Sequence, residues 1–106
     1  MLIKDWNIEK ITGYKPITTF YQDFSIADRF GISAIEDTFN RAFSEWKSNY
    51  KYLTELVMAL NWKIWEHYEH NDLYAEKYND LYETASIYAE SNLKDDELSY
   101  YYRTID

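Results

Sequence analysis

The stretch that decides the fold is the longest apolar segment of the chain, which reads YKYLTELVMALNWKIWEHYEH over residues 50–70. Its apolar side chains recur at the spacing of an α-helix and cover more than half of the helical circumference, which predicts a helix at the centre of a bundle. The broad apolar face consists of Leu53, Leu56, Val57, Leu60, Ile64, His67 and Tyr68, widened by Met58 and Trp65. The narrow polar strip holds Glu55, Lys63, Glu66 and His70.

A short helix is expected to precede this central one by some twenty residues. Thr19 with Gln22 forms a plausible capping box, so the helix is predicted to open there and to run to about Phe30. Gly31 would end it by supplying a left-handed cap. Residues 1–18, which a glycine and the single proline interrupt, are predicted to be mostly irregular.

The next helix has the clearest start signal in the sequence. Ser33 and Glu36 form a second capping box, and apolar residues then repeat in a narrow stripe as far as Trp46.

After the central helix, the Asn71-Asp72 pair predicts a break, followed by a helix from about Asp72 to Leu93. The expected inner face of this helix consists of Tyr74, Tyr78, Leu81, Tyr82, Ala85, Tyr88 and Ala89. Residues 94–106 are predicted to form an acidic and aromatic C-terminal tail that adds one short helical turn and then docks or frays.

The sequence therefore predicts an all-α fold, a compact bundle of about four helices, as a single domain over residues 1–106. Only two glycines and one proline are present, whereas a sheet protein of this size needs many turn residues. There is no cysteine, which excludes disulfides, cysteine-based zinc sites and thiol nucleophiles. No apolar run approaches the roughly 20 residues of a membrane span, so a soluble, cytoplasmic protein is expected.

Negative charge is concentrated in the second half of the chain. The net charge is −8, and the excess of acidic residues lies entirely after residue 53. Five acidic residues of the predicted 72–93 helix fall within about 80° of one another on the side opposite the apolar face. They are Asp72, Glu76, Asp80, Glu83 and Glu90, and together they are called the acidic stripe. Two readings remain open, an ordinary solvated face or a surface that docks a basic partner.

Aromatic residues supply further candidates for partner binding. Trp62 falls among acidic residues on the helical wheel, and Tyr101 lies in the aromatic tail. Tyrosine and tryptophan are favoured in protein interfaces because they combine a large contact area with a polar tip. For Trp62 the alternative is packing on the N-terminal segment, on Trp6 or Tyr14.

Two other kinds of site have weaker support. Ile26–Ser33 looks like the turn of a helix-turn-helix motif, but the would-be recognition helix carries more acidic than basic residues. Direct binding of nucleic acid is therefore not expected. The cluster of Glu66, His67, Glu69 and His70 lacks the Glu-x-x-His spacing of di-iron bundles, so no metal and no other cofactor is expected. Nothing in the sequence supports an enzyme.

Four stretches of the sequence carry a resemblance to known proteins: Phe24–Gly31, Ile35–Trp46, Lys51–Tyr68 and the ending Ser99–Thr104. They resemble small uncharacterised proteins carried by phages and by integrative and conjugative elements of Gram-positive bacteria. The resemblance implies a mobile-element origin and brings no functional residues with it. Small acidic proteins from such elements often bind host or element proteins, including defence nucleases.

The leading hypothesis is thus a non-catalytic interaction protein of a phage or mobile element. It would bind or inhibit a basic, nucleic-acid-binding partner through the acidic stripe, with Trp62 and Tyr101 nearby. The alternative is a small helix-turn-helix-like DNA-binding regulator that uses the helix pair at residues 20–47. The sequence leaves the oligomeric state open.

Overall fold

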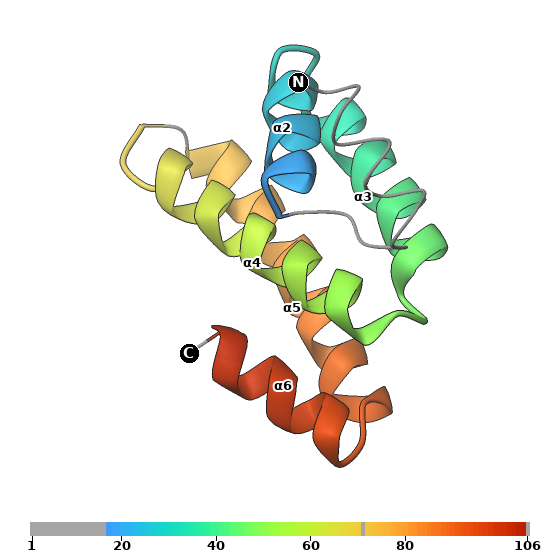
Figure 1. The fold of residues 1–106 in the computed structure, drawn as a ribbon. Helices are drawn as coiled ribbons and strands as arrows, with labels where there is room; N and C mark the ends of the chain where they lie inside the picture. The colour runs from blue at the N-terminus through green and yellow to red at the C-terminus, as the bar shows by residue number, and fades with distance from the viewer. Residues whose placement is uncertain (1–16, 71, 106) are drawn as a thin grey trace.

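The fold was analysed in a computed structural model that describes residues 17–70 and 72–105. Within these ranges the chain forms five α-helices and no strand, so the predicted all-α fold is confirmed (Figure 1). The helices are α2 (Ile17–Asp28), α3 (Ile32–Trp46), α4 (Tyr50–His67), α5 (Asp72–Asn92) and α6 (Asp96–Ile105). None of them is long and apolar enough to span a membrane.

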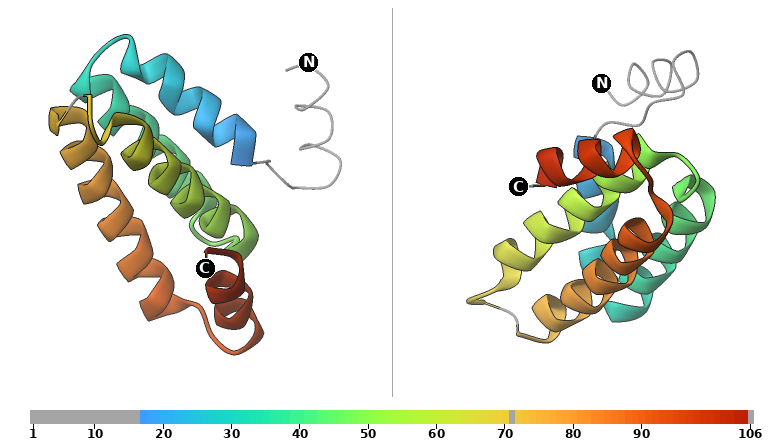
Figure 2. Two further views of the ribbon diagram at one scale, coloured as in Figure 1. Left: turned by 90° about the vertical axis from the view of Figure 1, so that its left-hand side faces the viewer. Right: turned by 90° about the horizontal axis from the view of Figure 1, so that it is seen from below.

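Helix α4 is the centre of the bundle, as its apolar circumference predicts. It packs against all four other helices. In Figure 1, α5 lies behind α4, α2 and α3 lie above α4, and α6 lies below it; Figure 2 shows α4 between α2 and α5. The side chains of Leu53, Leu56, Val57 and Leu60 are fully buried, which places the hydrophobic core along this helix. The same predicted face becomes exposed toward its end, at Trp65 and Tyr68.

The N-terminal boundaries of α2 and α3 differ from the two predicted capping boxes. Helix α2 already begins at Ile17, so Thr19 lies inside it, and the predicted irregular segment 1–18 is wrong for its last two residues. The rest of that segment lies outside the described residues. Helix α3 begins at Ile32, which places Ser33 in its first turn rather than at its cap.

Gly31 is the physical reason for the shift in α3. It adopts a φ of 107°, a conformation that other residues rarely take, and it is the N-cap of α3 without any side-chain hydrogen bond. Its N–H donates to the carbonyl of Ala27 at 3.2 Å. One glycine therefore closes α2 and opens α3, which leaves no room for a separate serine cap.

Helix α4 has a cap that the capping-box pattern missed. The side chain of Asn49 accepts hydrogen bonds from the backbone N–H groups of Lys51 and Tyr52 at 3.1 and 3.2 Å. Asparagine is among the preferred N-cap residues because its side-chain oxygen satisfies otherwise unpaired N–H groups of the first turn. This fixes the start of the central helix.

The predicted C-terminal tail contains more helix than the single turn expected, because Asp96–Ile105 forms a ten-residue helix, α6, and of the two predicted alternatives it docks rather than frays. It packs against α4 and α5 (Figure 2), and Tyr101 is its fully buried residue. The predicted role of Tyr101 in contacting a partner is therefore corrected: its ring belongs to the core.

Candidate functional site

The junction of α2, α4 and α5 holds a cluster of charged and aromatic side chains around Lys63. The sequence places this lysine on the polar strip of α4, yet in the structure its side chain is fully buried. Its ammonium lies 2.7 Å from Oδ2 of Asp28, 3.0 Å from Oε2 of Glu66 and 3.1 Å from Oγ of Ser25. The charge is thus neutralised by one carboxylate from α2 and one from its own helix, as burial of a charge requires.

Two tyrosines enclose the same ammonium. The Nζ atom of Lys63 lies 4.9 Å from the ring centroid of Tyr21 and 5.8 Å from that of Tyr78, within the range of cation–π attraction. The hydroxyl of Tyr21 donates to Glu66, and the hydroxyl of Tyr78 donates to Asp28. Each carboxylate that binds the lysine is therefore also held by a tyrosine.

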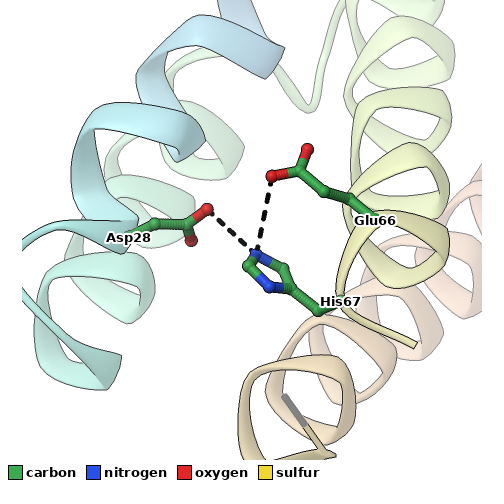
Figure 3. Close-up of side chains that lie close together, drawn as sticks. All are labelled: Asp28, Glu66 and His67. Atoms are coloured by element: carbon green, nitrogen blue, oxygen red, sulfur yellow. Dashed lines mark hydrogen bonds and ion pairs between the residues drawn. The ribbon is translucent and has the colours of Figure 1, made fainter. Parts of the chain in front are cut away.

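His67 completes the cluster at the end of α4. Its Nε2 lies 3.0 Å from Oδ2 of Asp28, and Figure 3 shows how the two side chains meet between α2 and α4. A carboxylate can only accept, so Nε2 carries the proton in this contact. The imidazole also stacks on Tyr78, with ring centroids 5.7 Å apart. The sequence places His67 on the broad apolar face of α4, and its largely buried side chain agrees with that position.

The cluster has some features of a metal site. Ligand atoms of Asp28, Glu66 and His67 all lie within 4.8 Å of one another, whereas the sequence suggested Glu69 and His70 as companions. The ammonium of Lys63, however, already contacts both carboxylates. A metal ion would have to displace a fully buried positive charge, so these residues fit an internal ion pair better than a metal centre. They tie α2, α4 and α5 together.

Hydrogen bonds in the cluster change the pKa of its members. Partial burial alone would raise the pKa of Glu66, but hydrogen bonds from Tyr21 and Lys63 outweigh it and hold the pKa below its ordinary value. The hydrogen bond to Glu66, followed by burial, raises the pKa of Tyr21. Burial, followed by the hydrogen bond to Asp28, raises the pKa of Tyr78 well above its ordinary value.

Two buried tyrosines provide a matched test of this network. Tyr78→Phe should lower the free energy of unfolding at neutral pH by about 1–3 kcal/mol, because Asp28 loses a hydrogen-bond donor. Tyr101→Phe should be neutral or stabilising, because the buried hydroxyl of Tyr101 has no hydrogen-bond partner among the described residues. Urea denaturation of both variants at pH 7 measures the difference. A larger loss for Tyr101→Phe would contradict the assignment.

The same variants should differ from the wild type at alkaline pH. The pKa of each of these tyrosines is raised in the folded protein, by burial first, above the ordinary value of 10.0. Their contribution to stability is therefore complete below pH 10 and is lost as pH rises, since the unfolded chain releases these protons first. Each phenylalanine variant should lose less stability between pH 9 and 11 than the wild type does. Parallel pH profiles would show that the pKa of the replaced tyrosine is not raised.

The acidic stripe lies where the sequence predicts it, on the exposed side of α5. All five of its carboxylates are exposed, and none forms an ion pair with another described residue. Three of them line a groove of about 430 Å³ between α5 and the end of α4. This acidic groove is lined chiefly by Asp72, Glu76 and Asp80 from α5, by Ile64 from α4 and by Tyr68, which directly follows α4. The structure separates these three acids from Glu83 and Glu90, which lie on the same helix outside the groove.

Exposed apolar residues flank the acidic groove. Trp65 is 68% exposed, with its ring 5.7 Å from that of Tyr68, and Leu73 is 63% exposed. Trp62 is also exposed and packs edge-on against Tyr21 at 6.1 Å. Its predicted alternative contacts, Trp6 and Tyr14, lie outside the described residues. Sequence reasoning assigned Trp65 to the core face and so missed it as a surface aromatic.

Neither a known protein family, nor a curated protein, nor a solved structure matches this chain.

Proposed function

We propose that this protein is a non-catalytic interaction module that binds a basic segment of a partner protein in the acidic groove. One observation carries the proposal: three carboxylates of α5, which form no ion pair with another described residue, line the groove beside Ile64 and Tyr68. Lysine and arginine side chains combine a charged end with an apolar stem, so they match both kinds of lining. The guanidinium or ammonium would bind the carboxylates, and the stem would lie against Tyr68.

The spacing of the three carboxylates also indicates the form of the bound segment. Asp72, Glu76 and Asp80 follow one another at four-residue intervals, which is about 6 Å along a helix. In an extended chain, every second side chain points the same way and is about 6.6 Å from the last. An extended segment with a basic residue at every second position would therefore place successive charges opposite successive carboxylates.

The alternative of a DNA-binding regulator has less support. Helices α2 and α3 do meet at a glycine corner, but the exposed residues of α3 include Glu36, Asp37 and Glu45 against Arg41. A helix that enters the major groove should be basic. Proteins that bind nucleic acid do carry basic segments, so they are the class of partner we expect. A partner from a host cell or a mobile element remains the prediction that follows from the resemblance.

The test uses a labelled 12-residue peptide of alternating lysine and threonine, with a glutamate–threonine peptide as its control. Fluorescence anisotropy should detect binding of the lysine peptide alone, and binding should weaken with added salt. The variant Glu76→Lys/Asp80→Lys should reduce the affinity at least tenfold. The matched variant Glu83→Lys/Glu90→Lys changes the net charge equally on the same helix, and it should have a much smaller effect. Circular dichroism should show both variants folded, because all four residues are exposed.

The two variants also separate the competing explanations. An equal loss in both would show that general negative charge, rather than the groove, attracts the peptide. Unchanged binding in both would show that the acidic stripe is only a solvated face. Tight binding of duplex DNA in a gel-shift assay would favour the DNA-binding alternative.

A further inference from the structure

A second and larger groove lies on another part of the molecule, between α2 and α3. Its volume is about 580 Å³. The lining includes Ile26 and Phe30 from α2 and the turn after it, and Trp46 from the end of α3. We call it the α2–α3 groove. It shares no lining residue with the acidic groove.

The apolar lining of the α2–α3 groove is unusually open to solvent. Phe30 is 75% exposed and Ile26 is 53% exposed, although both are large apolar side chains. Between the two helices the lining is formed by small residues, including Ala27, Ala34 and Ala42. Small side chains let another backbone approach closely, while large exposed ones provide anchors for it. The groove is therefore shaped for a third helix.

Charged residues along the same groove restrict what that helix can be. The exposed acidic side chains that line it are Asp37 and Glu45, and the exposed basic one is Arg41. A helix that lays an apolar stripe into the groove would bring the flanks of that stripe close to these acids. Basic flanks would complement them, and acidic flanks would be repelled.

We infer that the α2–α3 groove binds an amphipathic helix of a partner protein, with an apolar stripe flanked by basic residues. Helix α3 has 15 residues, so a partner helix of about four turns, roughly 22 Å, spans the groove. Phe30 and Ile26 pack against the apolar stripe near one end, and Trp46 packs near the other. This inference does not depend on the acidic groove, which would take an extended segment at a different surface.

The experiment uses the full chain and a labelled 15-residue helical peptide of leucine, lysine and alanine. Its leucines form one stripe, and its lysines flank that stripe. Fluorescence anisotropy should show saturable binding, and a peptide with glutamate in place of lysine should bind at least tenfold more weakly. Phe30→Ser should also weaken binding at least tenfold, as expected for an exposed anchor. Ile87→Ser on α5 is the matched control, since Ile87 is 63% exposed but lies outside the groove, and it should leave binding unchanged.

Four results would overturn the inference. The full chain could fail to bind the lysine peptide, or Ile87→Ser could weaken binding as much as Phe30→Ser does. Equal affinity for the glutamate peptide would show that the groove does not select a helix with basic residues beside its apolar stripe. Sedimentation equilibrium could instead show a dimer that Phe30→Ser converts to a monomer, which would assign the groove to a second copy of this chain. The acidic-groove variant Glu76→Lys/Asp80→Lys should still bind this helical peptide. Failure of the acidic-groove proposal is therefore distinguishable from failure of the α2–α3 groove proposal.

Discussion

Replacing Leu60 by alanine should lower the free energy of unfolding by about 2–5 kcal/mol. Leu60 is fully buried on α4, the helix that packs against every other described helix. Its removal deletes buried apolar surface and leaves a cavity that the surrounding helices can fill only in part. Urea denaturation, followed by circular dichroism at 222 nm, measures the loss.

The matched control is Leu73→Ala on α5, where the same side chain is 63% exposed. This variant should change the free energy of unfolding by no more than about 0.5 kcal/mol, as is usual for surface positions. A loss below about 1 kcal/mol for Leu60→Ala would mean that the core does not lie along α4. Similar losses in both variants would contradict the burial of Leu60.

The helices themselves could be predicted because their apolar periodicity is strong. The central position of α4 follows from an apolar face broader than half its circumference, and Leu53, Leu56, Val57 and Leu60 are buried on that predicted face. The pattern did not predict the burial of Thr54, Glu55 and Ala59. Helix boundaries depend on single residues, and there the pattern was less informative. Ser33 has the sequence of a cap, but Gly31 determines the turn through its backbone conformation.

Helix α6 shows a different limit of prediction. A ten-residue helix is too short to be stable by itself, so its formation depends on the surface against which it packs. That surface is supplied by α4 and α5, far away in the sequence. The tyrosines of residues 100–102 gave no sign of which ring is buried, and only the packed structure distinguishes Tyr101 from its neighbours.

The candidate sites also differ in how far the sequence could predict them. The exposure of the acidic stripe follows from one helix, so the sequence predicted it correctly. The acidic groove and the α2–α3 groove each need two helices placed side by side, which a helical wheel cannot provide. The sequence wrongly placed Lys63 on the polar surface of its helix, because a periodic pattern assigns a charged residue to the exposed side. Asp28, which neutralises it, lies on another helix.

The Lys63 cluster leads to the second large effect, which is expected for Lys63→Met. This variant should lower the free energy of unfolding by about 3–5 kcal/mol, although methionine is apolar and of suitable length for a buried position. The reason is that the carboxylate of Asp28, only 15% exposed, would lose the ammonium 2.7 Å away that neutralises it. The control is Lys77→Met, which breaks a more exposed ion pair with Glu36 and should cost no more than about 1 kcal/mol.

A double-mutant cycle with Asp28→Asn separates the lost ion pair from lost packing. If the loss of the neutralising ammonium causes the instability, Asp28→Asn should be less harmful in the Lys63→Met background than in the wild type. The double variant would then lose less stability than the sum of the two single variants, by at least about 1 kcal/mol, as expected for residues in direct contact. Additive losses would show that Lys63 contributes mainly through the packing of its side-chain stem. Urea denaturation of the four proteins at pH 7 decides between the two.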